Sequence, residues 1–313
     1  MIKVYRKPGK SNNVIVSVII SKEYFNFWEK YIFKNWYDYC KKYNLGLIIF
    51  DNYLDDRFKD IKTTWHKLLI GKLISEKNLK FKINNICYLD GDILINVFGS
   101  PNIFKKHHKD KITVVSQYKN LPYSLVETQK RISFFRHNFY SKRYPLDSSL
   151  FMKPSHIFKF HKFKNDLKCE NYFCAGLFIF NLRKFNHFIQ NIFYKYCRKK
   201  TITGGDEPIL NYEFQKLGKL NYIEYKYQAI WVYEMANKYP FLYWLKDPKI
   251  QSDCVSSSLM SNFFLHFAGS WYEKELIKSN IFFNSKKFLK KFFIYNKKKP
   301  RHTPRGLIRP EKS

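Results

Sequence analysis

Glycine and proline are scarce in this sequence, with eleven of each among 313 residues. That scarcity excludes a collagen-like chain and a Pro/Gly-rich disordered chain, and no repeat of 20 to 50 residues indicates a solenoid. Long hydrophobic runs are also missing, since none approaches the roughly 18 apolar residues that a membrane-spanning helix requires. The apolar run at 14–20 is short and lacks a small-residue cleavage site, so it does not resemble a signal peptide.

The cysteine pattern indicates a reducing compartment. The six cysteines form no Cys-x-x-Cys pair and no zinc-ligand spacing. Several of them lie inside apolar runs, where a thiol behaves as a small hydrophobic side chain. We therefore expect free thiols and a cytoplasmic protein, either soluble or attached peripherally to the inner face of a membrane.

Acidic residues are few: 25 of them face 57 basic residues, which gives a formal net charge of +32. Such an excess points to a polyanionic partner, such as nucleic acid, an anionic membrane or a phosphorylated substrate. However, 47 of the basic residues are Lys and only 10 are Arg, a bias that an AT-rich genome produces without any partner. Both explanations stay open. The 45% hydrophobic content excludes wholesale disorder, and the length fits two domains or one large α/β domain.

Apolar runs and amphipathic stretches alternate along the first hundred residues. This order of strand, helix, strand, helix, strand is typical of a parallel sheet with crossover helices, and it predicts an α/β fold. The expected strands are 14–20, 45–50 and 86–95, and the expected helices are 21–40, capped by Ser21, and 63–73. Further along, we expect strands at 112–115, 173–181 and 263–267 and helices at 182–196 and 206–217.

We expect one globular domain at 1–285, with a nucleotide-binding half at about 14–97 and an acceptor half at about 98–285. The remaining segment, 286–313, is basic and partly amphipathic, with Phe and Leu on one helical face and Lys on the other. Such a segment is suited to peripheral binding at an anionic membrane. A solvated, disordered tail is the alternative.

Asp90 and Asp92 follow an apolar strand and are separated only by Gly91. Alternate residues of a strand point the same way, so both carboxylates can reach one ion, and hard oxygen ligands suit Mg²⁺ or Mn²⁺ bound to a diphosphate. The carboxyl end of a strand is also where open α/β sheets bind ligands. The alternative is a plain Asp-Gly turn joining two strands of a hairpin.

Four ordered segments resemble nucleotide-sugar glycosyltransferases of the GT-A fold, and retaining family 8 in particular. Tyr88–Leu94 (YLDGDIL) resembles the D-x-D signature, and Tyr172–Phe185 (YFCAGLFIFNLRKF) is similar to the family's Y-F-N-A-G-V-L-L-I-N-L-K-K-W. Asp206–Asn211 (DEPILN) resembles D-Q-x-I-L-N, and His266–Gly269 (HFAG) resembles H-x-x-G. The resemblance covers about residues 14–275 and implies a single domain with a mixed central sheet flanked by helices. The family includes lipopolysaccharide galactosyl- and glucosyltransferases and glycogenin.

The resemblance implies that Asp90, Asp92 and His266 hold Mn²⁺ or Mg²⁺ against the donor diphosphate. Asp206 and Glu207 lie at the family's catalytic position, where Glu207 replaces the usual Gln. A carboxylate there could act as a nucleophile or stabilise an oxocarbenium-like transition state. The alternatives are a satisfied core histidine for His266 and, for Glu207, a first-turn residue favoured by the helix dipole.

Further donor contacts follow from the resemblance, with departures. The implied set is Tyr24, Lys67, Asp90, Gly91, Ala175, Gly176, Gly269 and Lys274. Lys67 could equally be a solvated helix lysine, and Tyr24 corresponds to a Tyr that stacks on uracil. The acidic residues that precede this Tyr in the family are Ser21 and Lys22 here, which puts recognition of the base in doubt. Cys174 replaces the Asn of N-A-G, and Tyr272 replaces a family Lys, for which Lys274 is a possible substitute.

These observations predict a hexosyltransferase that moves a sugar from a nucleotide-diphosphate donor, with UDP expected, to a glycan or glycolipid acceptor with retention. Two alternatives belong to other classes: a basic nucleic-acid-binding protein and an inactive GT-A module that binds sugar. A nucleic-acid partner is not expected, because the aromatic residues lie mostly in apolar runs and clustered carboxylates repel phosphates.

Overall fold

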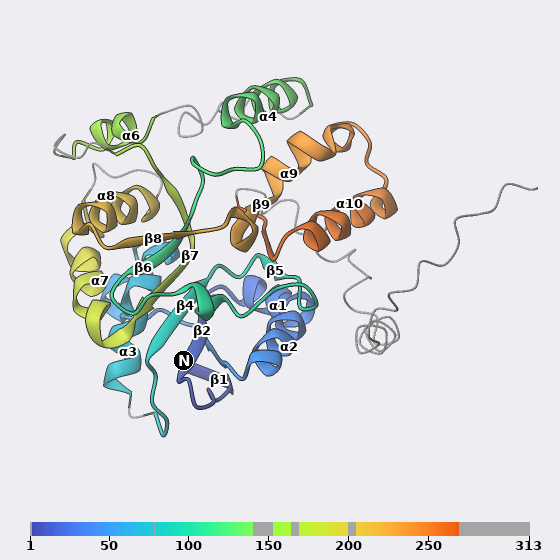
Figure 1. The fold of residues 1–313 in the computed structure, drawn as a ribbon. Helices are drawn as coiled ribbons and strands as arrows, with labels where there is room; N and C mark the ends of the chain where they lie inside the picture. The colour runs from blue at the N-terminus through green and yellow to red at the C-terminus, as the bar shows by residue number, and fades with distance from the viewer. Residues whose placement is uncertain (1, 78, 140–152, 164–168, 200–204, 269–313) are drawn as a thin grey trace, which may run out of the picture.

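The fold is built on a seven-stranded mixed sheet. We describe a computed structural model over residues 2–77, 79–139, 153–163, 169–199 and 205–268. The strand order is β1-β3-β2-β4-β7-β6-β8, and β7 and the edge strand β1 are antiparallel to their neighbours (Figure 1). A small sheet, β5-β10-β9, lies beside it. The bounds are β1 Ile2–Arg6, β2 Asn13–Val18, β3 Gly46–Phe50, β4 Asn85–Leu89, β5 Ile93–Ile95, β6 Ile112–Ser116, β7 Phe173–Asn181, β8 Leu220–Ile223, β9 Ala229–Ile230 and β10 Phe264–His266.

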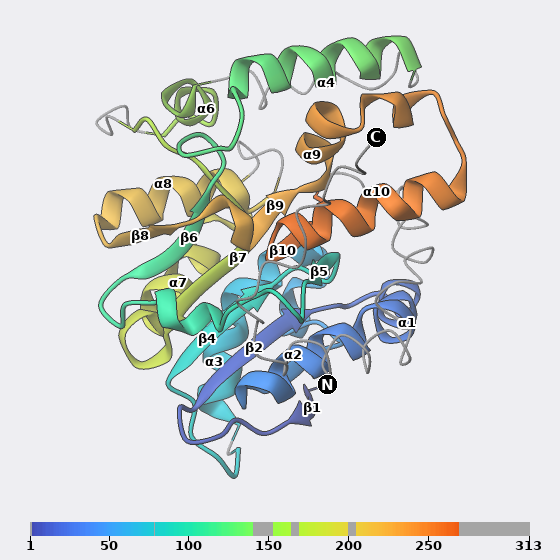
Figure 2. The same ribbon diagram turned by 45° about the vertical axis from the view of Figure 1, so that its right-hand side comes forward.

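Helices cover both faces of the large sheet. One face packs against α1 and α2 and the small sheet, and the other packs against α3, α7 and α8. In both views, α9 and α10 lie beside the small sheet, and α4 and α6 lie on the side of the molecule away from β1 (Figures 1 and 2). The helices are α1 Lys22–Tyr31, α2 Phe33–Tyr43, α3 Ile70–Glu76, α4 Leu125–Phe139, α6 Pro154–Phe160, α7 Leu182–Tyr196, α8 Glu207–Leu217, α9 Trp231–Lys238 and α10 Pro248–Ser261. Short 3₁₀ helices occur at Asp56–Phe58, Thr63–Leu69, Ile103–Lys106, Tyr225–Gln228 (η4) and Pro240–Tyr243.

The central strands are apolar on both faces because both faces are covered. In β2, Val14 and Val16 pack into one core, and Ile15, between them, packs into the other. Such strands appear in the sequence as continuous hydrophobic runs rather than alternating ones. The α/β class, the mixed sheet and its flanking helices are thus confirmed, and β7 and α7 have the predicted bounds.

Three expectations about local structure were wrong. The single helix expected at 21–40 is two helices that meet at Ile32, where the buried ring of Trp28 packs against Trp36 and the partly buried Phe33. The segment 63–73 begins as a 3₁₀ helix. The strand expected at 86–95 is divided between the two sheets. The cap at Ser21 is as predicted, since its hydroxyl accepts a hydrogen bond from the Tyr24 backbone N–H at 3.0 Å.

Several elements carried too weak a signal to be expected. The polar start of the chain forms β1, which pairs antiparallel with β3 at the edge of the sheet, where charged residues are tolerated. β8 and β9 are too short to stand out in the sequence. Among the described residues, no helix combines the length and the apolar character needed to cross a bilayer. The segment 286–313 lies outside the described residues.

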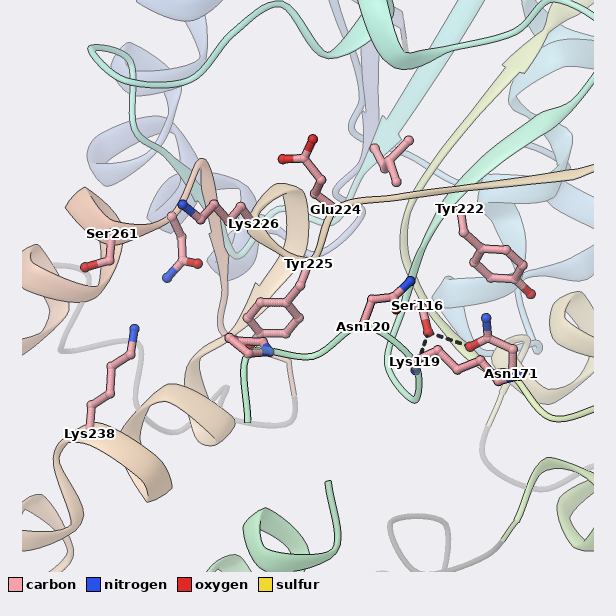
Figure 3. Close-up of a pocket in the computed structure, with 13 residues that line it drawn as sticks. Ser116, Lys119, Asn120, Asn171, Tyr222, Glu224, Tyr225, Lys226, Lys238 and Ser261 are labelled. Carbon is pink, nitrogen blue, oxygen red and sulfur yellow. Dashed lines mark hydrogen bonds between the residues drawn. The ribbon is translucent and has the colours of Figure 1, made fainter. Parts of the chain in front are cut away.

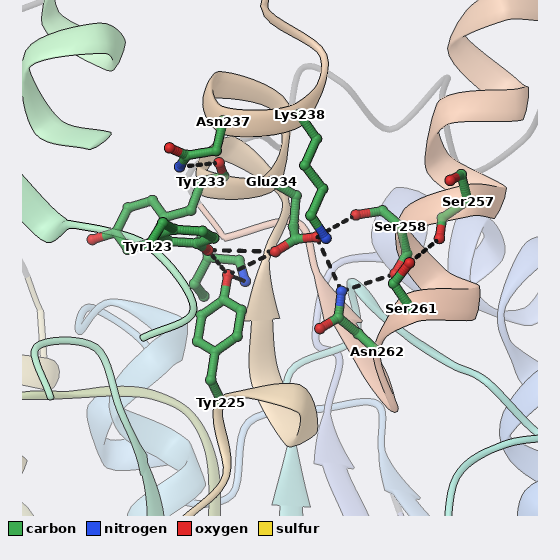
Figure 4. A network of polar contacts seen from close by, with 11 residues as sticks. Tyr123, Tyr225, Tyr233, Glu234, Asn237, Lys238, Ser257, Ser258, Ser261 and Asn262 are labelled. Carbon is green, nitrogen blue, oxygen red and sulfur yellow. Dashed lines mark hydrogen bonds and ion pairs between the residues drawn. The ribbon is translucent and has the colours of Figure 1, made fainter. Parts of the chain in front are cut away.

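A buried carboxylate on α9 lies at the centre of a network of polar contacts. Glu234, on α9, has no solvent-exposed surface. Its carboxylate accepts hydrogen bonds from hydroxyl and amide groups and pairs with an ammonium: Ser258 (2.7 Å), Asn262 (3.0 Å), Lys238 (2.6 Å), Tyr123 and Tyr225 (both 3.4 Å) (Figure 4). A buried charge is tolerated only when it is paired and hydrogen-bonded in this way. The network therefore fixes α9, α10 and η4 relative to one another.

Replacing Glu234 with Gln should destabilise the protein by about 3 kcal/mol, because an amide N–H₂ would face the same donors and Lys238 would lose its partner. The matched control is Glu224→Gln, which breaks an exposed 2.9 Å pair with Lys106 and should cost less than about 1 kcal/mol. Urea unfolding of both variants measures the difference. Equal losses would show that the Glu234 network contributes no special stability.

Acid should weaken the fold through His107. Burial, with His108 beside it, lowers the pKa of His107 from 6.5 to about 4, and its Nδ1 lies 2.9 Å from Thr113 Oγ1. The unfolded chain therefore binds this proton at a higher pH than the folded protein does, so stability is lost as the pH falls from about 6.5 towards 4. Wild type and His107→Gln should be unfolded in urea across this range. The variant should lose less stability on acidification, and identical slopes would contradict the assignment.

Candidate functional site

The Asp90–Gly91–Asp92 turn carries the chain from the large sheet to the small one. The Asp90 N–H donates to the Gly176 carbonyl at 2.8 Å, and the Phe267 N–H donates to the Asp92 carbonyl at 3.2 Å. β4 pairs with β2 and β7, and β5 pairs with β10, so the alternative of a hairpin is wrong. The carboxylates converge because the turn folds them together, not because they alternate along a strand.

His266, on β10, lies close to the carboxylates of Asp90 and Asp92. Its Nε2 lies 3.2 Å from Asp92 Oδ1 and 3.7 Å from Asp90 Oδ2. One ligand atom from each of the three side chains fits within 4.8 Å of the others. The imidazole is buried, and the two carboxylates keep some exposure, which leaves the cluster accessible from one side. Two carboxylate oxygens and one imidazole nitrogen form a donor set that suits Mn²⁺ or Mg²⁺.

Gln228 sets the orientation of this histidine. It is fully buried in η4, and with its amide placed to satisfy its neighbours, Oε1 accepts from His266 Nδ1–H and from the Leu177 N–H, both at 3.1 Å. Its Nε2 then donates to the Cys174 carbonyl at 3.3 Å. A proton held on Nδ1 makes Nε2, which faces Asp92, the atom available to a metal ion. Outer hydrogen bonds of this kind fix the tautomer of metal-binding histidines.

The fit for a cation is supported by an unpaired oxygen. Asp92 Oδ1 is buried and makes no hydrogen bond within the described part of the chain. It lies 3.2 Å from His266 Nε2, and although burial opposes the rise, the charge of Asp92 raises the pKa of His266 well above its usual value. A positive charge placed there would satisfy both atoms. The residues present therefore fit a divalent metal.

Gly176 makes room for the cluster. A Cβ at this position would lie 2.3 Å from His266 Cε1 and 2.7 Å from Asp90 Oδ2, closer than real contacts allow. Any side chain would push apart the imidazole and the carboxylate. Glycine is thus required here by close approach rather than by backbone conformation.

A second group of charges lies on the other side of Ala175. Lys67 is almost completely buried, and its Nζ contacts Asp206 Oδ2 at 2.7 Å and donates to the Ala175 carbonyl at 3.0 Å. The Ala175 N–H donates to Glu207 Oε2 at 3.1 Å. Gly205 has a φ of +96°, which turns the chain just before α8 begins at Glu207. Ala175 thus contacts Glu207 directly and Asp206 through Lys67, and Lys67 is not a solvated lysine.

Burial and neighbouring charges shift the pKa values of this group. Burial and the charge of Asp92 raise the pKa of Asp90, against the opposing effect of Lys67. Burial likewise raises the pKa of Glu207, with Asp206 adding to the rise. The pKa of Lys67 is raised because Asp206 and Asp90 outweigh its burial. Carboxyl groups that are short of positive charge are characteristic of ligand sites.

The remaining predicted contacts divide into two groups. Tyr24 lies over the turn, with its hydroxyl 2.8 Å from where a Gly91 Cβ would be, so the structure brings both residues to the site. Cys174 Sγ lies 3.7 Å from His266 Nδ1, beside Gln228 and not among the metal ligands. Gly269 and Lys274, and Tyr272 between them, lie outside the described residues.

Comparisons with known proteins bear on this arrangement. No protein-family model matches the sequence, and no curated protein matches it. Among solved structures, a glycosyltransferase involved in the glycosylation of the major capsid of PBCV-1 is 9% identical, with a TM-score of 0.50 over 86% of this chain and 98% of that one. The chain has the GT-A fold. At this identity the likeness concerns the fold alone, and kinship with family 8 stays a prediction.

Two further structures are similar at lower scores. The bifunctional glycosyltransferase WbbM is 13% identical with a TM-score of 0.46, over 91% of this chain but only 52% of WbbM. The galactosyltransferase LgtC, solved with donor and acceptor sugar analogs, is 12% identical with a TM-score of 0.42, over 85% of this chain and 95% of LgtC.

Two residues that complete the site were not predicted. The Tyr88 hydroxyl donates to Asp90 Oδ1 at 2.6 Å, and its place two residues before Asp90 could have suggested this contact. Gln228 had no signal, because nothing in the sequence connects η4 to a histidine 38 residues away. Only the pairing of β9 with β10 brings them together.

Replacing Gln228 with Leu should weaken Mn²⁺ binding by about 10- to 100-fold, because His266 loses the acceptor that holds its tautomer. Gln228→Glu keeps an acceptor oxygen and should bind Mn²⁺ more tightly than the Leu variant. The EPR signal of free Mn²⁺ measures the affinity, with and without UDP. Gln117→Leu is the control, since Gln117 is also buried but its amide has no hydrogen bond among the described residues. Unchanged affinity in Gln228→Leu would refute the role.

Proposed function

We propose that this protein is a glycosyltransferase that moves a hexose from a nucleotide-diphosphate sugar, with uridine as the expected base, to a glycan or glycolipid acceptor. The observation that carries the proposal is the convergence of two charge groups on one strand of a GT-A fold. Asp90, Asp92 and His266 form one group beside Gly176, and Lys67, Asp206 and Glu207 form a second group around Ala175. Neither a nucleic-acid-binding surface nor a plain core requires this arrangement.

The metal triad is proposed to anchor the donor. A divalent ion bound there would neutralise the charge that develops on the departing nucleoside diphosphate. Two of the three side chains are held in advance: Asp90 by the Tyr88 hydroxyl, and His266 by Gln228. Preorganisation of this kind avoids reorganisation during the reaction. Tyr24, which lies against the turn, is the candidate contact for the base.

Asp206 and Glu207 are proposed to act on the sugar. Lys67 pairs with Asp206 and neutralises its charge, so Glu207 carries the net negative charge of this group. Glu207 is held by one hydrogen bond, which its Oε2 accepts from the Ala175 N–H. A carboxylate beside the anomeric carbon stabilises the positive charge that develops there, as in retaining glycoside chemistry. Retention of configuration is proposed on this ground.

Calorimetry with UDP-, GDP-, dTDP- and CMP-sugars tests the proposal. With Mn²⁺ present, one diphosphate donor class should bind, and EDTA or Asp92→Asn should remove at least 90% of the affinity because a charged ligand atom is lost. The CMP-sugar, which has a single phosphate, should bind weakly. Asp56→Asn is the matched control, since its side chain is 74% exposed and lies outside the site.

The catalytic step is tested separately from donor binding. Glu207→Gln should bind the donor like wild type but lower transfer or slow donor hydrolysis by about 100-fold or more. Binding without any turnover in the wild type would favour an inactive sugar-binding module. If no donor binds with Mn²⁺, the proposal is wrong.

A further inference from the structure

A pocket of about 450 Å³ opens beside the site, at the same edge of the large sheet. It is lined where β6 and β8 end, by the loop after β6 and by η4 (Figure 3). β6 and β8 run parallel to β4, so their carboxyl ends meet the edge where β4 delivers Asp90. Ligands of open α/β sheets bind at this edge. None of the residues placed in the metal or catalytic groups lines the pocket.

Three segments lead directly from the pocket to the two charge groups. Asn171 lines the pocket and is three residues from Cys174, so their Cα atoms are at most about 11 Å apart. Asn262, which also lines the pocket, is four residues before His266, the last residue of β10. Tyr225 is three residues before Gln228 within η4. A short oligosaccharide bound in the pocket could therefore extend to the reacting centre.

Two tyrosines connect the pocket to Glu207 in particular. Tyr118 and Tyr172 have ring centroids 6.0 Å apart, and each is adjacent in sequence to a residue that lines the pocket. After burial, the charge of Glu207 is the main cause that raises the pKa of both phenols. Tyr172 is also three residues before Ala175, whose N–H donates to Glu207 Oε2, so this segment leads from the pocket to the candidate catalytic carboxylate.

One end of the pocket has the groups that recognise sugar hydroxyls. Asn171 Oδ1 accepts from Ser116 Oγ and the Tyr172 N–H, and within the described chain nothing accepts a hydrogen bond from its Nδ2. Asn120 is exposed and held in a left-handed conformation with φ +60°. Tyr222 exposes 36% of its surface beside them. Amides provide directional hydrogen bonds, and a phenol ring offers an apolar face with a polar tip.

The other end carries unbalanced positive charge. Lys226 is exposed and has no carboxylate within ion-pair distance among the described residues, where its Nζ lies 5.8 Å from the Phe263 ring centroid. The pocket's acidic residue, Glu224, pairs with Lys106 at 2.9 Å. Lys238 is held by the buried Glu234 on the same side. Lys119, which also lines the pocket, pairs with Glu170 at 2.8 Å, so among the described lining residues Lys226 is the lysine left for a ligand.

We propose that this pocket binds the acceptor, and that the acceptor is a glycan with a negatively charged substituent recognised by Lys226. The inference rests on the proposed function, since it assigns the acceptor of that reaction. Asn171, Asn120 and Tyr222 bind the neutral part of the glycan, and Lys226 pairs with its carboxylate or phosphate. A charge-assisted hydrogen bond is about twice as strong as a neutral one, so the charge decides which glycan binds.

Binding of matched glycans tests the proposal. The probes are sialyllactose and lactose, which differ by one charged sugar, together with trigalacturonate and a lactose 6-phosphate. At least one charged probe should bind about tenfold more tightly than lactose. Lys226→Gln should reduce that preference to about twofold or less and leave lactose unchanged. Lys30→Gln, an exposed lysine on α1 far from the pocket, is the control. Tyr222→Ala should weaken all probes alike.

The outcomes separate this proposal from the function on which it rests. Donor binding with Mn²⁺ is measured on the same samples, and it should be the same in Lys226→Gln as in wild type. If donor binds but no charged probe exceeds lactose, or if Lys226→Gln keeps the preference, the pocket assignment is wrong and the transferase survives. If charged probes bind through Lys226 but no donor binds, the transferase is wrong and the assignment of an acceptor falls with it.

Discussion

The site depends on the balance of buried charge around strand β7. Four carboxylates gather around strand β7, and Lys67 is the buried lysine that faces them. Lys67 forms its ion pair with Asp206, so Asp90 and Asp92 have too little positive charge around them. Burial makes this shortage costly, because a charge removed from water must be compensated. A bound divalent ion would supply what the chain itself lacks.

Such a cluster has to be held by a rigid frame. The turn at 90–92 is fixed on one side by Gly176, through a sheet hydrogen bond, and on the other by Phe267 of the small sheet. The small sheet is anchored in turn by the network around Glu234, which joins α9, α10 and η4. The Glu234 network therefore supports the position of His266 from outside the metal group.

The same frame leaves a face for a second substrate. The pocket beyond Tyr118 and Tyr172 combines amides, an exposed ring and the cation of Lys226. In a chain with a net charge of +32, most lysines are uninformative, because composition alone can account for them. Lys226 differs because it lines a pocket close to the candidate reacting centre and has no carboxylate within ion-pair distance among the described residues.

The sequence by itself determined the class of the fold and five strands of the large sheet, and it named the candidate residues of the site. Buried strands are continuous apolar runs, so β2, β3, β4, β6 and β7 were readable, and Asp90 and Asp92 stood out because charges rarely interrupt such runs. Only the tertiary structure decided that β4 and β5 belong to different sheets, that Lys67 is buried against Asp206, and that Gln228 holds His266. The reason is physical: these contacts join residues far apart in the chain, and local patterns contain no information on which distant strands pair.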